Sequence, residues 1–451
     1  MVSHHTSVGT PYAPHDEEDK KAMLDAIGVA DVEELYSLPS ELQYDGSFGI
    51  EPRSEQRTIQ EVSSLLQHNE DVIEFLGRGH YTHYVPSLVD HLSDRSEFLT
   101  SYTQYQPEVS QGFLQALFEY QSVFSELTGL PVVNCSLNDP ATALGEAARM
   151  AARVRAADGD TILIPETLPD RQHEVLHTYV DATGISIQSY AYNDGVTDPA
   201  AIEEHVDEDI LMIYTPSPTI LGTIEPNLEQ IGNLASDHDA LFCVGSDPVA
   251  LSILESPESV GADIAIGNAG VLGMQTSYGF DVGFFATRDD FIRQLPGRLV
   301  GATTDADNNR AYTMVLQTRL QHIRRERATS NICTNAAWAA LRSVMHAAML
   351  GPQGLVNLAS TCIEAPKQLA DELDSIQGID APVHDQHHFR EFVCRTEKSA
   401  AHIADQLLDE GCAVHVIDDH QIQICVTDMN REHSDKLVSA VKQAVYGRAV
   451  Q

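Results

Sequence analysis

The segment TILIPETLPDRQHEVLHTYVDATGISIQSYAYNDGVTDPAAIEEHVDEDILMIY, residues 161–214, holds the pattern that decides the fold. Short apolar runs at 161–165, 185–190 and 210–214 are separated by stretches with helical spacing. Such runs are typical of strands buried on both faces of a sheet. Strands that alternate with helices favour a mainly parallel sheet with helices on both sides.

The same alternation continues on either side of this segment. Helices are predicted at 141–157 and 228–238, and further strands at 241–245, 264–266 and 282–287. We therefore predict a large α/β domain over residues 71–330. Ligands of such sheets bind beyond the carboxyl ends of the strands. The loops that meet this condition lie at 216–222, 246–248 and 267–279.

Two further regions flank the predicted large domain. Residues 1–70 are expected to form an N-terminal arm with helices, including an amphipathic helix predicted at 55–76 that runs into the next domain. A Gly-Pro-Gln-Gly break at 351–354 separates two helices. The pattern of strands and helices that follows predicts a smaller C-terminal α+β domain over residues 331–451.

The charge balance limits the possible classes of function. The 451 residues include 67 Asp+Glu and 27 Lys+Arg, with a formal net charge of −40. Acid spread along the whole chain argues against a nucleic-acid binder. It suits a cytoplasm rich in salt, where charge repulsion is screened within about 3 Å at 1 M. No apolar run has transmembrane length, and seven dispersed cysteines indicate reduced thiols, so we expect a cytoplasmic protein.

A cluster of arginines stands out in this acidic chain, within residues 311–335, AYTMVLQTRLQHIRRERATSNICTN. Alternating apolar residues at its start predict a half-buried strand, and Thr334 or Asn335 is expected to begin and cap a helix. The arginines either pair with an acidic surface elsewhere in the fold or form a basic pocket or docking surface. The candidate residues of this cluster are Arg319, His322, Arg324 and Arg325.

Tyrosines and a histidine gather in two loops before the large domain's first long helix. Residues 79–86 contain Tyr81, His83 and Tyr84, and residues 96–108 contain Tyr102 and Tyr105. Such side chains either pack at a half-exposed surface or form the rim of a pocket. All five are candidates for a substrate channel or a subunit interface.

Several stretches are similar to one known family. They include EFLG at 74–77, HYVP at 83–86, residues 96–107, SQG at 110–112, LFEYQ at 117–121, LTG at 127–129, ATAL at 141–144, PGR at 296–298 and residues 316–335. In these stretches the chain resembles the glycine decarboxylase P-protein of the glycine cleavage system, in the first subunit of its two-chain form. Family members commonly have Tyr in place of Asn138 and Gly in place of Pro140, and the loop at 268–280 is poorer in glycine and proline.

The resemblance implies a fold, an activity and partners. The fold is that of pyridoxal-phosphate (PLP)-dependent transferases, aspartate aminotransferase-like and of fold type I, with a small C-terminal domain. The activity is that of glycine dehydrogenase (aminomethyl-transferring), an oxidoreductase of glycine catabolism that decarboxylates glycine and transfers the aminomethyl group to the lipoyl arm of the H-protein. The implied partners are a second subunit, in a heterotetramer with two copies of each chain, and the H-protein.

The expected cofactor lysine is missing from this chain. PLP enzymes hold their cofactor through a Schiff base with a lysine. No lysine lies between residues 22 and 366, and the loop at 267–279, where this fold carries it, has no amine. We therefore expect no catalytic residue in this chain, with the Schiff-base lysine and the bound PLP on the partner subunit.

Two other classes of function compete with the enzyme subunit. One is a catalytically silent scaffold or regulatory homologue of PLP enzymes, and the other a lysine-free binding protein for free PLP or an amino acid. Asp247 either faces a cofactor ring nitrogen or caps a strand end, and the missing lysine favours the cap. His387 and His388 have no carboxylate or thiol at ligand spacing, so no metal is expected.

Overall fold

The computed structural model describes residues 15–36, 39–42, 44, 46, 49–69, 71–99, 104–154, 159–206, 209–275, 281–315 and 323–447. The chain splits into two compact units, Met1–Glu70 and Asp71–Gln451. No helix in these described ranges is both long and apolar enough to cross a membrane.

The first unit is built from helices whose apolar side chains are exposed. Its elements are α1 (Glu17–Ile27), η1 (Glu33–Leu35), η2 (Ser40–Leu42) and α2 (Glu55–Leu66). Asp16 caps α1 by accepting the Glu18 and Asp19 N–H groups, and the Ser54 hydroxyl accepts the Arg57 N–H at the start of α2. None of the described residues with assigned exposure in this unit is buried.

The helix predicted at residues 55–76 is wrong beyond Leu66. Ile73–Glu74 instead forms strand β1, which pairs in parallel with β15 (Cys412–Ala413). The N–H of Ile73 donates to Gly411 O at 2.9 Å and that of Phe75 to Ala413 O at 2.8 Å. These partners lie far along the sequence, so local apolar spacing could not reveal them.

The second unit contains a seven-stranded sheet of order β2-β10-β9-β8-β7-β3-β4. The strands β3, β4, β7, β8 and β9 are parallel, and β10 runs antiparallel to both of its neighbours, β9 and β2, as expected for a mainly parallel sheet. The strands are β2 (Val132–Val133), β3 (Thr161–Pro165), β4 (Ser186–Tyr190), β7 (Ile210–Pro216), β8 (Leu241–Ser246), β9 (Ile264–Asn268) and β10 (Gly283–Thr287).

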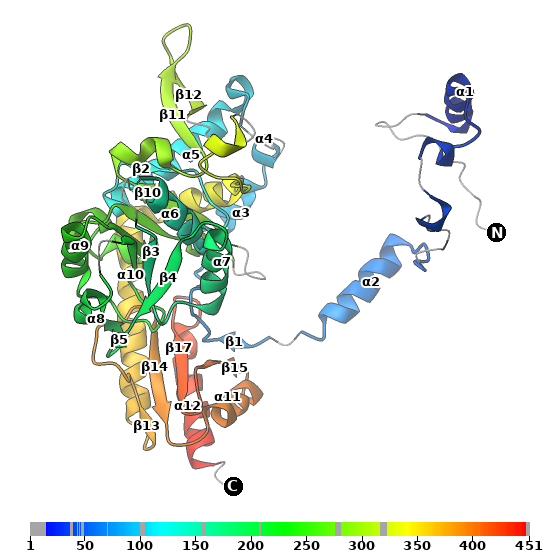
Figure 1. The fold of residues 1–451 in the computed structure, drawn as a ribbon. Helices are drawn as coiled ribbons and strands as arrows, with labels where there is room; N and C mark the ends of the chain where they lie inside the picture. Colours follow the sequence, from blue (N-terminus) through cyan, green and yellow to red (C-terminus); the bar gives the residue numbers. More distant parts are fainter. Residues whose placement is uncertain are drawn as a thin grey trace. The chain divides into compact units, whose positions relative to one another are not determined.

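Helices cover both faces of this sheet (Figure 1). Successive side chains of a strand point to opposite faces, so Ile162 and Ile164 pack in one cluster with α6 and α7 whereas Leu163 packs in another with α9. This arrangement explains the apolar runs that predicted the strands. The covering helices are α5 (Pro107–Thr128), α6 (Pro140–Val154), α7 (Asp170–Val180), α9 (Leu228–Asp237) and the first part of α10 (Ala337–Asp374).

The strand predicted at the start of the arginine-rich stretch is confirmed. It is β12 (Arg310–Val315), which forms an antiparallel hairpin with β11 (Leu299–Thr304). Figure 1 shows the hairpin at the end of this unit opposite the C-terminal strands. Its base is held by Gln111 of α5, whose side chain bonds the backbone N–H and C=O of Tyr312.

The helix that follows does not begin with the predicted cap. Helix α10 has Ala336 at its N-cap, without a side-chain hydrogen bond. The Asn335 side chain is engaged elsewhere, because its Oδ1 accepts from Arg298 Nη1 at 3.0 Å. The predicted break within this helix is present as a kink at Gly351, whose φ is +63°.

The C-terminal part of the second unit has its own sheet of order β13-β14-β17-β16 and its own core. Its elements are β13 (Ile379–Asp380), β14 (Glu391–Thr396), α11 (Ala400–Asp409), β16 (His415–Val416), β17 (Gln421–Cys425) and α12 (Ser434–Tyr446). Shorter elements complete the unit: α3 (Ser87–Ser93), α4 (Ser96–Leu99), β5 (Tyr192–Asn193), β6 (Val196–Thr197), α8 (Pro199–Glu203), η3 (Ala250–Ser252), η4 (Pro257–Val260), η5 (Ala269–Val271), η6 (Asp289–Gln294), η7 (Arg325–Arg327) and η8 (Arg431–His433).

Candidate functional site

A pocket opens beyond the carboxyl ends of β7, β8 and β9, and the three loops predicted from the sequence at 216–222, 246–248 and 267–279 contribute to its lining. Its empty volume is about 780 Å³, part of it open to solvent. Residues from the loop after β1, from the ends of the large sheet's strands and from the segment before β14 line it together. They include Tyr81, Ser246, Asp247, Asn268, Phe389 and Arg390.

A buried ion pair closes one wall of the pocket. Arg390 donates from Nη1 to Asp247 Oδ2 at 2.7 Å and from Nη2 to Asp247 Oδ1 at 2.9 Å. Asp247 Oδ1 also accepts the N–H groups of Val249 and Ala250, so the carboxylate caps the turn that follows β8, in line with the cap that the missing lysine favoured. Burial acts to raise the pKa of Asp247, but the Arg390 guanidinium outweighs it and holds that pKa below its usual value.

His83 extends this pair into a chain of four side chains. Its Nε2 accepts from Arg390 Nε at 3.1 Å, and its Nδ1 lies 2.6 Å from Asp428 Oδ1. Because Nε2 is the acceptor, Nδ1 carries the proton and donates it to Asp428. Burial lowers the pKa of His83 despite the Asp428 carboxylate. The ring is therefore neutral, which suits its position beside a guanidinium.

Tyr81 also contacts Arg390, and it has a carboxylate partner of its own. Its hydroxyl donates to Glu391 Oε1 at 2.5 Å, and the Arg78 N–H donates to Glu391 Oε2 at 3.0 Å. The Arg390 guanidinium carbon is 4.5 Å from the centre of the Tyr81 ring. Burial raises the pKa of Glu391 to about 7, partly offset by these hydrogen bonds.

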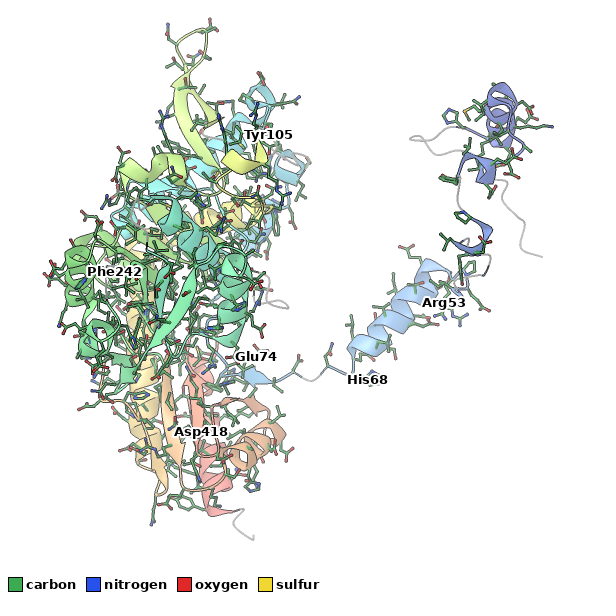
Figure 2. All side chains as sticks on the ribbon, in the orientation of Figure 1. Arg53, His68, Glu74, Tyr105, Phe242 and Asp418 are labelled. Atoms are coloured by element: carbon green, nitrogen blue, oxygen red, sulfur yellow. The ribbon has the colours of Figure 1, made fainter. Side chains whose placement is uncertain are left out.

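The other predicted tyrosines lie outside this cluster. Tyr84 is 61% exposed, and only its backbone N–H reaches Asp428. The Tyr105 hydroxyl accepts from Arg298 Nη2 at 3.4 Å. Figure 2 shows Tyr105 at the end of this unit far from Asp418 of the C-terminal sheet region. Tyr102, Arg319 and His322 fall outside the described residues.

The arginines that follow the β11–β12 hairpin are exposed. Arg324 and Arg325 lie at η7, and no carboxylate among the described residues pairs with either. The choice between an ion-pair network and a docking surface therefore stays a prediction.

Four residues of the pocket cluster were missed as site residues: Arg78, Arg390, Glu391 and Asp428. Arg390 and Glu391 are 1% and 0% exposed, yet they stand in the apolar run FREFVC at 389–394. Charged side chains inside an apolar strand are buried only where ion-pair or hydrogen-bond partners compensate their charge. Two charged residues within an apolar run are therefore the sequence signal that could have pointed to this site. The signal does not identify the partners of these residues.

The pocket residues do not fit PLP in this chain. No lysine lies among the described residues that line the pocket. Asp247 is the acid that could face the ring nitrogen of PLP, but its charge is already neutralised by Arg390.

The sequence matches the family model of the glycine cleavage system P-protein over residues 10–441. It is 56% identical to the probable glycine dehydrogenase (decarboxylating) subunit 1 of Halobacterium salinarum, over 96% of this chain and 99% of that protein. The protein of the same description from Thermococcus onnurineus is 42% identical over 90% of this chain and 91% of its own length.

Solved structures show the same relationship. A crystal structure of glycine decarboxylase (P-protein) in inhibitor-bound form superposes with a TM-score of 0.88 at 35% identity, covering 96% of this chain and 100% of that one. A sphingosine-1-phosphate lyase and a cysteine desulfurase, each 14% identical with a TM-score of 0.60, share the fold alone. The fold is therefore that of PLP-dependent enzymes of fold type I, and the chain belongs to the glycine cleavage system P-protein family.

Proposed function

We propose that this chain is the lysine-lacking subunit of a two-chain glycine decarboxylase, active only with a second subunit that carries the lysine and PLP. The observation that carries the proposal is a P-protein fold in which the described residues that line the pocket include no lysine but do include an aspartate already paired with Arg390. The enzyme decarboxylates glycine and transfers the aminomethyl group to the lipoyl arm of the H-protein, in the cytoplasm.

The exposed arginines are proposed to serve the interface or the substrate channel of the assembled enzyme. Arg324 and Arg325 are free of carboxylate partners in the described ranges of a chain of net charge −40. Glycine brings a carboxylate, and an arginine offers it a planar fork of donors. Tyr84 and Tyr105, both partly exposed, are proposed for the same surface, whereas Tyr81 and His83 position the pocket wall from inside.

Residues 1–70 are proposed as an assembly arm. In α2, Ile59, Val62, Leu65 and Leu66 are 57%, 48%, 70% and 56% exposed. Contiguous exposed apolar side chains of this kind mark protein–protein contacts. We propose two copies of each subunit, with the arm packing on a partner chain, and with domains at 71–330 and 331–451 that share the pocket.

The proposal predicts a role in catalysis for the exposed arginines. Arg324→Ala is expected to lower glycine–bicarbonate exchange by the reconstituted two-subunit enzyme with H-protein at least ~10-fold, about 1.4 kcal/mol of barrier. The matched control is Arg395→Ala, because Arg395 is also exposed but pairs with Asp380. The control should keep the unmutated rate.

The outcomes of this experiment separate the possible roles. Thermal unfolding of the isolated chain should be unchanged by Arg324→Ala. A full rate from the assembled Arg324→Ala enzyme would contradict a catalytic or channel role for this residue, whereas failed assembly would place it at the subunit interface. If the second subunit alone catalyses the exchange at the full rate, this chain is instead a catalytically silent scaffold.

The charge of the chain predicts a requirement for salt. Lowering the salt from molar to ~0.1 M lengthens the Debye length to about 10 Å, so the negative charges repel each other. We propose that the protein is halophilic, and we expect its thermal midpoint to fall over this range. An unchanged midpoint measured by circular dichroism would contradict this expectation.

A further inference from the structure

Asp247 is a buried carboxylate that needs a positively charged partner. It follows β8 directly, lines the pocket and is 5% exposed. In PLP-dependent enzymes an acid in such a pocket faces the protonated ring nitrogen of the cofactor. A buried carboxylate without a cation is strongly destabilising. A chain that holds no cofactor therefore needs another positive charge at this position.

Arg390 supplies that charge with all of its guanidinium nitrogens engaged. Two of them form the bidentate pair with Asp247, and Nε donates to His83. The guanidinium carbon lies 4.5 Å from the Tyr81 ring centre and 4.8 Å from that of Phe389, so aromatic rings contact it as well. Hydrogen bonds and ring contacts thus fix the group in one position.

The backbone also directs Arg390 into the pocket wall. Its φ is +63°, in the left-handed region that bulky residues rarely adopt. Such a conformation persists only where the surroundings determine it. Here the Arg390 N–H donates to Cys362 O at 2.7 Å, and the Arg390 carbonyl accepts the Val426 N–H at 2.6 Å. Two elements of the C-terminal part therefore hold the strained residue in place.

We propose that Arg390 replaces the cofactor cation in this chain: it is the permanent counter-ion of Asp247 and excludes PLP from the pocket. The missing lysine alone would still allow free PLP to bind without a covalent bond, and Arg390 removes that possibility too. This inference rests on the proposed role of this chain as the subunit without cofactor and deepens it. The test below examines only this pocket, so the inference can fail while the subunit role stands.

The test measures ligand binding by thermal unfolding of the full chain. Four chains are compared: unmutated, Arg390→Ala, Asp247→Asn and the double variant. The probes are methylguanidinium, with methylammonium as its control, and pyridoxamine 5′-phosphate, which has no aldehyde to react with the six lysines. Arg390→Ala should lower the midpoint by several degrees, and either methylguanidinium or pyridoxamine 5′-phosphate should restore at least half of that loss.

The unmutated chain and the double variant should respond to neither probe. Arg342→Ala is the matched control, because Arg342 is a buried arginine paired at 2.5 Å with Asp90, outside the pocket lining. It should lose stability without responding to pyridoxamine 5′-phosphate. Stabilisation of the unmutated chain by pyridoxamine 5′-phosphate would overturn the proposal, as would equal responses from Arg390→Ala and the double variant.

A second measurement covers the case in which Arg390→Ala does not fold. The neutral pair Arg390→Met/Asp247→Asn removes both charges while it retains much of the side-chain volume. If Arg390 serves as the counter-ion of Asp247, this double variant should unfold at a higher temperature than Arg390→Met alone. A midpoint at or below that of the single variant would show that Arg390 acts through other contacts and would overturn the proposal.

Discussion

The Gly222→Ala variant is expected to unfold with a free energy about 4 kcal/mol lower than that of the unmutated chain, or to fail to fold. Gly222 has φ +85°, and a Cβ built on it would lie 1.8 Å from the carbonyl oxygen of Glu391. That oxygen belongs to the backbone at the start of β14, which is held by its pairing with β17. The Gly222 carbonyl itself accepts the Phe389 N–H at 2.8 Å, so the two segments cannot easily separate.

A matched control distinguishes this clash from the cost of the backbone conformation. Gly261 has nearly the same φ, +83°, but nothing lies within 4 Å of the position that a Cβ would take there. Gly261→Ala should therefore cost only about 1 kcal/mol, the usual penalty for a side chain in the left-handed region. Urea unfolding at constant salt measures both losses. Equal losses would show that the contact between residues 222 and 391 is not tightly packed in solution.

The His346→Asn variant is expected to lose less stability on acidification than the unmutated chain. His346 is 1% exposed, and its Nδ1 accepts the Gly273 N–H at 2.9 Å. Burial, with a smaller contribution from the Arg342 guanidinium, lowers the pKa of His346 from 6.5 to about 4. Between these values the unfolded chain binds a proton that the folded chain does not, so the stability present above pH 6.5 falls as the pH falls.

The size of this effect follows from the two pKa values. The unmutated chain should lose on the order of 3 kcal/mol more than His346→Asn between pH 7 and pH 4. Asparagine keeps an oxygen able to accept the Gly273 N–H but does not titrate. Urea unfolding of both chains across this range is the measurement. Parallel stability curves would mean that His346 takes up its proton as easily in the folded chain as in the unfolded one.

The strands of the large sheet could be predicted because their neighbours bury them on both faces. A short apolar run such as 210–214 predicts a buried strand. The loops that follow such strands then indicate where the pocket lies. The extension of the helix to residue 76 failed because Ile73 pairs with a strand more than 300 residues later. Local spacing contains no information about such a partner.

The pocket could be located from the sequence, but its chemistry could not. Asp247 was recognised as a strand-end aspartate, and Tyr81 and His83 as candidates. Their common partner, Arg390, lies 143 residues after Asp247, and nothing local relates the two. The absence of lysine was visible at once, because it is a property of composition. The replacement of a cofactor charge by an arginine is a property of the folded chain alone.

The division of labour between two subunits is tested most directly by locating the covalently bound cofactor. The reconstituted enzyme is incubated with PLP and reduced with borohydride, and the peptides of both subunits are then analysed by mass spectrometry. We predict a pyridoxyl group on a lysine of the partner subunit and on none of the six lysines of this chain. A stoichiometric pyridoxyl group on any lysine of this chain would contradict the account.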